Sequence, residues 1–252
     1  MIIKYILAAI FTIAVTDLLA ANIQAKTWLI ADGDGNILES NNIEVKQPIA
    51  SITKLMTAIV ILDANENMTA EIPNRRLRGL PMSRLQLLNL AIVKSDNQAA
   101  DMLCKVYRRG YAGCIEDMNH KAKILGMQDS EFHDSTGLNN GNVSTAKDLI
   151  ILLKAAEKYS EIVHASNQAV GEIINKKKRK WTKWRYTNTN PLVAKYNVIV
   201  SKTGYVRLSG GCLVMSAYIN GEKRLFVVLN SKTTRTRIVD MEQLVISTTA
   251  AK

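Results

Sequence analysis

The chain of 252 residues has few of the side chains that crosslink small folds through disulfides or bind metal ions. It contains only three cysteines and three histidines. Cys104, Cys114 and Cys212 are too few for a disulfide scaffold and lack the spacing of a metal site, and the histidines form no H-E-x-x-H motif. Cys104 and Cys114 are able to pair in an oxidising compartment, but we favour three small, buried thiols. The sequence predicts no metal site.

Long apolar runs are absent after the first segment, since none approaches the roughly 20 residues that span a bilayer. The N-terminus itself has the features of a secretory signal. Lys4 forms a short positive region, "YILAAIFTIAV" is the apolar region, and "AANIQA" leads to a cleavage site after Ala25. We expect a signal peptide over residues 1–25 and an exported protein. Because Asp17 interrupts this pattern, an uncleaved membrane anchor is the alternative.

Acidic residues are scarce, because 22 Asp and Glu stand against 33 Lys and Arg, and the formal net charge is +11. Such an excess favours anionic partners, such as nucleic acid, a membrane surface or an acidic polymer. The densest cluster is "KKKRKWTKWRY", residues 176–186, in which cations are interleaved with aromatic rings. In a cytosolic protein this pattern would indicate nucleic-acid binding. Export argues against nucleic acid, and a solvated hairpin that adds solubility is the simplest interpretation.

Strand and helix patterns are distributed unevenly along the chain, of which 47% is apolar and 22% charged, as in a globular protein. Strand patterns lie near both ends, in "TWLIADGDGNILES", "NVIVSKTGY", "GCLVMSAYI" and "RLFVVLN". Asn220–Gly221 is a hairpin turn between the last two. A final helix is expected through "VDMEQLVI". Strands therefore flank a helical middle, which predicts an α/β fold with an all-helical insertion.

The helical middle has recognisable starts and stops. Ser83 and Ser144 are expected to cap two of its helices, and another helix is expected through "QAADMLCKVYRR" up to Gly110. Residues 65–82 are polar and contain two prolines, so we expect a loop there.

Three short motifs follow one another along the chain. They are S-x-x-K at 51–54, expected at a helix start, S-D-N at 95–97, between two helices, and K-T-G at 202–204, on a strand. S-x-x-K alone is weak evidence, since "STAK" at 144–147 also matches, and S-x-N occurs again at 40–42. The ordered set is the signature of class A β-lactamases and penicillin-binding proteins.

The first motif places an amine beside a hydroxyl, because residues three apart share one face of a helix. A serine is a poor nucleophile at neutral pH and needs an adjacent base. Burial of Lys54 among neighbours such as Leu55 and Ile59 would lower its pKa by disfavouring the charged form, and Lys202 would act in the same direction. Without the other two motifs, a Ser–Lys face open to solvent would be the better interpretation.

The chain resembles the low-molecular-mass penicillin-binding proteins, the serine DD-peptidases of bacterial cell-wall metabolism, from about residue 27 to 247. Besides the three motifs, "KLMTAIVILDA", "NHKAKILGM", "DSTGL" followed by "NVSTAKDL", "RYTNTNPLV" and "GGCLVM" carry the resemblance. These strings are most similar to the endopeptidase branch, the penicillin-binding protein seven type. The resemblance implies the β-lactamase/transpeptidase-like fold, an antiparallel sheet flanked by helices. A single catalytic domain would cover 26–250, with its α/β part at about 26–65 and 160–250 and the helical insertion at about 66–159.

The resemblance also implies a role for each motif residue. Ser51 would attack the carbonyl of a D-Ala–X bond and form an acyl-enzyme, with Lys54 as the general base. Ser95 would relay a proton to the leaving amine, and Asn97 would hold the substrate peptide and the lysine. Lys202 would supply positive charge for a carboxylate.

The residues after Lys202 would bind substrate. Thr203 would be a hydrogen-bond partner, and Gly204 would leave room for an extended peptide along the strand edge. The backbone N–H groups of Ser51 and Tyr205 would form the oxyanion hole. The resemblance implies no cofactor. With the signal pattern, the expected location is the periplasm, in association with the membrane or the cell wall.

The expected partners are peptidoglycan peptides as substrates and β-lactam antibiotics as covalent inhibitors. An anionic wall polymer is a candidate partner for Lys176–Arg185, and nucleic acid is not expected. The leading function is an endopeptidase that cleaves D-Ala–diaminopimelate crosslinks, and the alternative is a carboxypeptidase that removes terminal D-Ala. Only 44 positions separate Ser51 from Ser95, which is short for the family and affects substrate preference.

Two other functions are disfavoured. A β-lactamase would need an E-x-x-L-N pattern, and none occurs between Ser95 and Lys202. A non-enzymatic wall-binding protein is disfavoured because all three motifs are intact.

Overall fold

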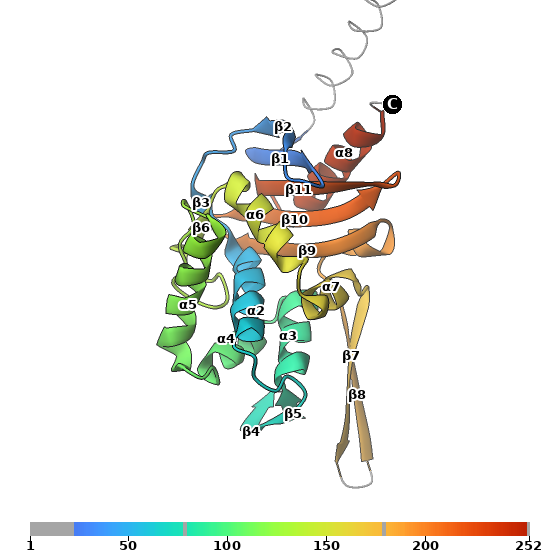
Figure 1. Ribbon diagram of the computed structural model, residues 1–252. Coiled ribbons are helices and arrows are strands. Elements are labelled where there is room, and N and C mark those ends of the chain that lie inside the picture. Colours follow the sequence, from blue (N-terminus) through green and yellow to red (C-terminus); the bar gives the residue numbers. More distant parts are fainter. Residues whose placement is uncertain (1–22, 78–79, 178–179, 251–252) are drawn as a thin grey trace, which may run out of the picture.

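The computed structural model describes residues 23–77, 80–177 and 180–250, and its largest sheet joins the two ends of this described chain (Figure 1). The sheet is antiparallel, with strand order β2-β1-β11-β10-β9. Its strands are β1 (Thr27–Asp32), β2 (Ile37–Asn41), β9 (Asn197–Val206), β10 (Gly210–Ile219) and β11 (Glu222–Ser231). The prediction of an antiparallel sheet built from the two ends of the chain is confirmed.

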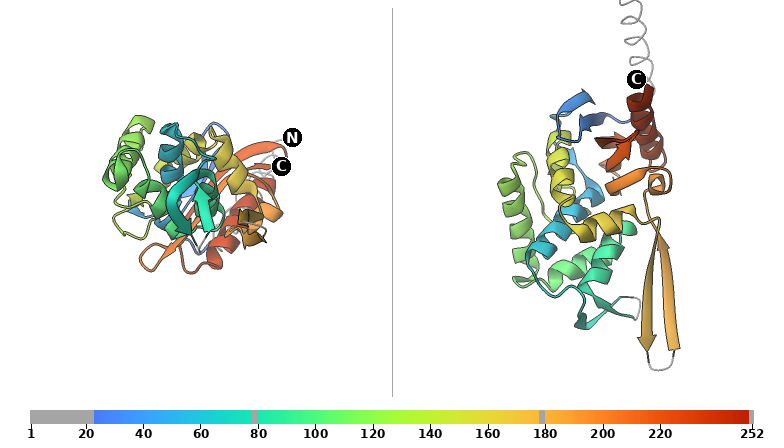
Figure 2. Two further views of the ribbon diagram at one scale, coloured as in Figure 1. Left: turned by 90° about the horizontal axis from the view of Figure 1, so that it is seen from below. Right: turned by 45° about the vertical axis from the view of Figure 1, so that its right-hand side comes forward.

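Helices cover both faces of this sheet. Side chains point alternately to the two faces along each strand, so each face contributes to its own buried apolar cluster. In β1, Leu29 and Ala31 join one buried apolar cluster, whereas Trp28 and Ile30 join another. The second cluster contains residues of α8 (Thr236–Ala250), and the first contains residues of α6 (Ala146–Ala156). Figure 2, right, shows α8 and α6 on opposite sides of the sheet.

The helix α2 (Thr53–Asp63) forms the centre of the helical part. It is buried from Thr53 to Ile61, as expected for a helix that is apolar on nearly all sides. Around it pack α3 (Arg84–Val93), α4 (Asn97–Lys105), α5 (Gly110–Leu125) and α6. The helix α7 (Ser160–Asn167) contacts α3 and β9. The helical part, with α2 at its centre, therefore lies directly against β9, the strand that carries the K-T-G motif.

Short elements complete the described chain. They are η1 (Ala50–Ile52), η2 (Pro191–Ala194), β3 (Gln47–Pro48) paired with β6 (Val143–Ser144), β4 (Glu71–Leu77) paired with β5 (Leu80–Ser83), and β7 (Val170–Lys177) paired with β8 (Lys180–Thr187). The β7–β8 hairpin extends away from the rest of the protein (Figure 1).

The structure corrects the loop expected over residues 65–82. The strands β4 and β5 form an antiparallel hairpin there, so the insertion between the two parts of the sheet is not wholly helical. Its prolines, Pro73 and Pro81, are compatible with strands because each strand of an isolated hairpin has an unpaired edge. The predicted cap at Ser83 is confirmed, since Ser83 and Gln86 form a capping box at the start of α3.

Two further expectations about the helical middle are wrong. The helix expected to run to Gly110 ends at Lys105, and a new helix begins at Gly110. The cap of α6 is Thr145 rather than Ser144, because the Thr145 hydroxyl accepts a hydrogen bond from the Asp148 amide. Ser144 lies in β6 instead and contacts the Ser130 hydroxyl at 2.8 Å.

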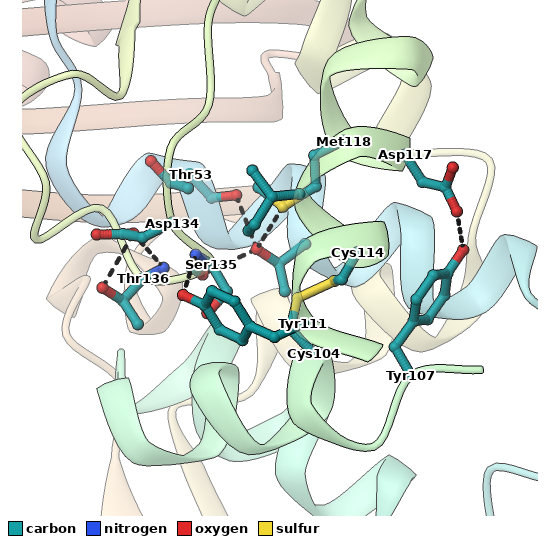
Figure 3. Close-up of a disulfide and its surroundings, with 12 residues drawn as sticks. Thr53, Cys104, Tyr107, Tyr111, Cys114, Asp117, Met118, Asp134, Ser135 and Thr136 are labelled. Atoms are coloured by element: carbon teal, nitrogen blue, oxygen red, sulfur yellow. Dashed lines mark hydrogen bonds between the residues drawn. A yellow bond between two sulfur atoms is a disulfide. The ribbon is translucent and has the colours of Figure 1, made fainter. Parts of the chain in front are cut away.

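The end of α4 at Lys105 explains why the structure differs from the unpaired state expected for the cysteines. The turn after α4 brings Cys104 against Cys114 in α5, and the two form a disulfide with a Cα–Cα distance of 5.4 Å (Figure 3). The preferred interpretation of three buried thiols is therefore wrong for this pair. Cys212 is buried as a free thiol, as that interpretation expected.

The predicted signal peptide lies almost wholly outside the described residues, since they begin at 23. Among the helices that the structure does describe, none has the length and apolar character needed to cross a bilayer.

Candidate active site

The three sequence motifs converge beside the N-terminus of α2. Lys54 Nζ donates hydrogen bonds to Ser51 Oγ at 2.8 Å and to Asn97 Oδ1 at 2.7 Å. Lys202 Nζ donates to Ser95 Oγ at 2.8 Å. Lys54 of the S-x-x-K motif and Lys202 of the K-T-G motif thus each contact a residue of the S-D-N motif, at the junction of α3 and α4. The structure therefore brings together all five residues predicted as catalytic.

The backbone around Ser51 is held by close contacts with the K-T-G strand. A Cβ atom on Gly204 would lie 2.8 Å from the Ile49 carbonyl oxygen and 3.0 Å from the Ser51 amide nitrogen. Only glycine therefore allows β9 to approach this closely. Ala50, which precedes Ser51, has φ +47°, and Ser95 has φ +58°. Such conformations are unfavourable for residues with a side chain and persist where the surrounding structure imposes them.

Lys54 is fully buried, and all three of its possible donors have acceptors. Besides Ser51 and Asn97, its Nζ donates to the Thr136 carbonyl oxygen at 2.6 Å. Burial lowers the pKa of Lys54 to about 7, although the negative charges of Asp134 and Asp96 oppose this effect. The predicted lowering by burial is confirmed. Near neutral pH, a large fraction of Lys54 is uncharged and able to accept a proton.

Lys202 is also buried, and its pKa is lowered well below the usual value by burial and by the nearby charges of Lys54 and Arg237. Its Nζ also donates to the Thr203 carbonyl oxygen at 3.0 Å. Two buried ammonium groups close together are mutually unfavourable. An anion that reaches this site would favour the charged form of Lys202, which suits the binding of a carboxylate.

The residues predicted to bind substrate lie on β9, which is an edge strand of the sheet. Thr203 is buried, whereas the Tyr205 side chain is 50% exposed. An edge strand offers unpaired backbone groups to an extended peptide. Across the parts of the chain that the structure describes, no cluster of side chains is suited to hold a metal ion.

Several residues of this site escaped the sequence analysis. Arg237 of α8 is buried, and its Nη1 donates to the Gly204 carbonyl oxygen at 2.7 Å. Thr189 Oγ1 lies 2.6 Å from Thr203 Oγ1, and the Thr189 amide donates to the Val93 carbonyl oxygen at the end of α3. Thr189 lies within the string "RYTNTNPLV", but no local pattern in the sequence identifies it or Arg237 as part of the site.

The comparisons with known proteins agree with this geometry. The crystal structure of the Streptomyces K15 DD-transpeptidase matches with a TM-score of 0.83 and 25% identity, over 91% of this chain and 98% of that chain. A penicillin-binding protein D2 from Listeria monocytogenes, in its ampicillin-bound form, matches with a TM-score of 0.77 and 25% identity, over 89% of this chain and 97% of that chain. The fold and the site therefore define a serine enzyme of the transpeptidase-like class.

The family follows from the sequence matches. The model of the D-alanyl-D-alanine carboxypeptidase family matches residues 14–75 and 72–233, and the chain belongs to this family. A D-alanyl-D-alanine endopeptidase of Escherichia coli is 35% identical over 249 residues, which are 92% of this chain and 80% of that protein. The resemblance drawn from the motifs is confirmed.

Proposed function

We propose that the protein is a serine DD-peptidase that cleaves D-Ala–diaminopimelate crosslinks of bacterial peptidoglycan through an acyl-enzyme. The observation that carries this function is the 2.8 Å contact between Ser51 Oγ and the buried amine of Lys54. The similarity to the D-alanyl-D-alanine endopeptidase of Escherichia coli supports the endopeptidase reaction. The family description supports the alternative, a D-Ala-D-Ala carboxypeptidase that removes terminal D-Ala.

The reaction begins when uncharged Lys54 takes the hydroxyl proton of Ser51. Ser51 Oγ forms a bond to the carbonyl carbon of D-Ala, and the backbone N–H groups of Ser51 and Tyr205 stabilise the negative oxygen. The proton then passes through the Ser95 hydroxyl to the leaving amine as the C–N bond breaks. In a second step, water attacks the carbonyl carbon of the resulting ester and Lys54 accepts its proton. This proton passes to Ser51 Oγ as the ester C–O bond breaks and the D-Ala carboxylate leaves.

The neighbouring side chains hold the substrate during these steps. Asn97 accepts a hydrogen bond from Lys54 through its Oδ1, and its amide N–H groups would hold the substrate peptide. Lys202 and Thr203 bind a carboxylate of the substrate, and Gly204 leaves room for the peptide along β9. A β-lactam follows the same first step and remains attached to Ser51, and the ampicillin-bound form of the Listeria protein supports this inhibition.

Crosslinked muropeptides distinguish the two peptidase reactions. The purified protein is incubated with crosslinked dimers and, separately, with monomers that end in D-Ala-D-Ala. An endopeptidase converts the dimers to monomers, and Ser51→Ala abolishes this conversion. Release of free D-alanine from the monomers with intact dimers would show a carboxypeptidase instead.

We also propose that the β7–β8 hairpin binds an anionic wall polymer. The run Lys176–Arg185 contains seven basic residues, and the hairpin projects from the body of the protein (Figure 1). Among the side chains of this run that the structure describes, Lys183 and Arg185 form ion pairs with Glu172 on the opposite strand. A positively charged extension of this kind would concentrate the protein on an anionic polymer.

Binding to purified sacculi tests the hairpin. Retention is expected to fall steeply with added salt, because exposed charges are screened. The triple variant Lys176→Glu, Lys178→Glu and Lys180→Glu should abolish retention. A control with the same charge change at exposed sites away from the hairpin, Lys123→Glu, Lys158→Glu and Lys232→Glu, should retain binding. Equal loss in both variants would contradict a specific role for the hairpin.

Export to the periplasm is a further part of the proposal. The N-terminal signal pattern supports it, and so does the Cys104–Cys114 disulfide, because such bonds persist in oxidising compartments. Cell fractionation, with mass analysis of the mature N-terminus, tests both the location and the predicted signal peptide over 1–25. The single catalytic domain over 26–250 stays a prediction, and expression of that segment alone as a stable, penicillin-binding protein would support it.

A further inference from the structure

A loop after α5 packs directly against the backbone that carries the nucleophile. Gly137 in this loop has φ +82°, and a Cβ there would lie 1.9 Å from the Ala50 carbonyl oxygen and 2.8 Å from the Ser51 amide nitrogen. At the other end of the loop, the Asn142 carbonyl oxygen accepts a hydrogen bond from the Ile49 amide at 3.0 Å. The position of Ser51 is therefore tied to the shape of the loop at 134–142.

The shape of this loop is organised around one carboxylate, that of Asp134. Its Oδ1 accepts hydrogen bonds from the amides of Thr136 and Gly137, both at 2.6 Å, and from Asn142 Nδ2 at 2.9 Å. Its Oδ2 accepts from the Asn139 amide at 2.6 Å. The Thr136 hydroxyl adds a further contact at 3.1 Å (Figure 3). Five donors from within the loop thus converge on a single side chain.

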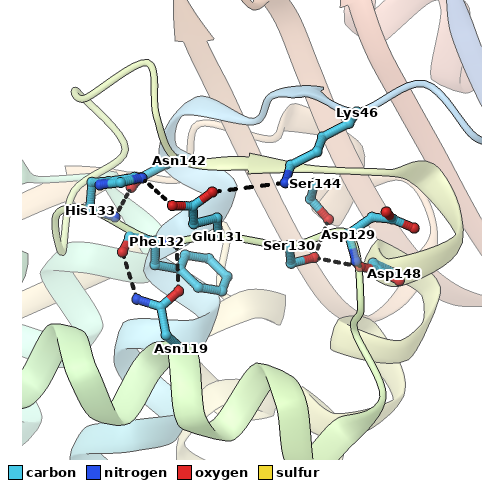
Figure 4. Close-up of polar contacts among 10 residues, drawn as sticks. All are labelled: Lys46, Asn119, Asp129, Ser130, Glu131, Phe132, His133, Asn142, Ser144 and Asp148. Atoms are coloured by element: carbon cyan, nitrogen blue, oxygen red, sulfur yellow. Dashed lines mark hydrogen bonds and ion pairs between the residues drawn. The ribbon is translucent and has the colours of Figure 1, made fainter.

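Asn142 reinforces the same arrangement from the far end of the loop. Its side chain is fully buried, and its Oδ1 accepts hydrogen bonds from the amides of His133 at 2.6 Å and Asp134 at 3.2 Å. Figure 4 shows Asn142 beside His133 on this part of the chain. The two ends of the loop are therefore fastened to each other through Asp134 and Asn142.

The loop contacts the proposed base through the Thr136 carbonyl oxygen, which accepts a hydrogen bond from Lys54 at 2.6 Å. An uncharged amine has two N–H groups and one lone pair. If the two N–H groups are donated to Asn97 Oδ1 and the Thr136 carbonyl, the lone pair is left to face Ser51 Oγ. The Thr136 carbonyl therefore helps to set the direction in which Lys54 accepts a proton.

We propose that Asp134 is a positioning residue of the active site, whose carboxylate holds the Thr136 carbonyl against Lys54 and so aims the lone pair of the amine at Ser51. This inference rests on the proposed serine peptidase function. Asp134 itself touches neither the nucleophile nor the base, and it acts through the loop backbone.

The charges around Lys54 give this role a measurable signature. Burial raises the pKa of Asp134, but the amides of Gly137, Asn139 and Thr136 outweigh it, so the net pKa is lowered and the carboxyl is ionised. The negative charges of Asp134 and Asp96 raise the pKa of Lys54, whereas burial lowers it. On the side of β9 lies Lys202, whose charged form is disfavoured by burial and by the charge of Lys54.

The variant Asp134→Asn removes this charge and places an NH₂ donor where the carboxylate accepts hydrogen bonds. The acylation rate by a fluorescent penicillin is measured as a function of pH. We expect the maximal rate to fall at least about tenfold, because the Thr136 carbonyl is displaced. We also expect the midpoint of the pH profile to shift to lower pH, because one of the charges that favour the protonated amine is lost.

The matched control is Asp148→Asn. Asp148 also accepts hydrogen bonds from its surroundings, from the Asp129 amide at 2.9 Å and the Ser130 hydroxyl at 2.7 Å, but belongs to α6 (Figure 4). Its variant is expected to lower stability and to leave the midpoint unchanged. A folded Asp134→Asn protein with the wild-type rate and midpoint would overturn the inference.

A milder variant covers the case in which Asp134→Asn does not fold. Thr136→Val removes one of the five donors to Asp134 and keeps the negative charge. We expect a lower maximal acylation rate with an unchanged midpoint, and an unchanged rate would count against the role of the loop. If the wild-type protein itself is not acylated, the proposed function fails. A normally acylated wild type with an unaffected variant refutes the Asp134 inference alone.

Discussion

Acylation of Ser51 by a β-lactam is expected to depend on pH through the protonation of Lys54. The amine is fully buried and its pKa is about 7. With this pKa, about 9% of Lys54 is uncharged one unit below it and about 91% one unit above it. Because only the uncharged amine accepts the Ser51 proton, the acylation rate should rise about tenfold between these two pH values.

The assay is the second-order rate constant for acylation by a fluorescent penicillin, measured with stopped flow over this pH range. The sign follows from the chemistry, since a lysine that must lose its proton gives a rate that increases with pH. Lys54→Arg is the control, because a guanidinium stays protonated and is unable to act as the base. Its acylation should be very slow at every pH.

A flat profile for the wild type would refute this reasoning, since it would mean that protonation of Lys54 does not limit the reaction. A rate that decreases as pH rises through about 7 would contradict the assigned direction of proton transfer. Retention of fast acylation in Lys54→Arg would exclude Lys54 as the base.

Three further variants test the packing around the site. Gly137→Ala should slow acylation at least about a hundredfold, because its Cβ would collide with the Ala50 carbonyl oxygen and displace the nucleophile; wild-type kinetics would contradict this contact. Thr189→Val should weaken β-lactam binding with little change in the melting temperature, because it removes the hydroxyl that contacts Thr203. Acylation kinetics measure the first effect and a thermal melt measures the second. Cys104→Ser should lower the free energy of unfolding in urea by about 3 kcal/mol, as loss of a crosslink between residues 10 positions apart predicts, and leave the acylation rate unchanged.

The motif residues were predictable because each motif is a short local pattern and the three occur in a characteristic order along the chain. The S-x-x-K spacing puts Ser51 and Lys54 on one helix face, and the apolar residues around Lys54 predict its burial and lowered pKa. The strand patterns at both ends of the chain likewise predict strands there, whereas their antiparallel arrangement was an implication of the family resemblance. These inferences depend on residue patterns in the sequence, so they needed no knowledge of the tertiary structure.

The parts that were missed depend on contacts between distant segments. Arg237 reaches Gly204 from α8, and Asp134 reaches Lys54 only through the Thr136 carbonyl, so neither role has a sequence pattern. The disulfide was not favoured because three cysteines are too few for a disulfide scaffold and a Cys104–Cys114 pair leaves Cys212 free. The sequence predicted a helix that continues through "VYRR" to Gly110, whereas α4 ends at Lys105 and the turn after it brings Cys104 to Cys114.

The most direct test is the mass of the intact protein after treatment with excess penicillin. The account predicts that the mass increases by one β-lactam molecule, that the adduct maps to the peptide containing Ser51, and that Ser51→Ala shows no increase. An unchanged mass of the wild type, or an adduct on another residue such as Ser95, would contradict the central claim that Lys54 activates Ser51 as the nucleophile.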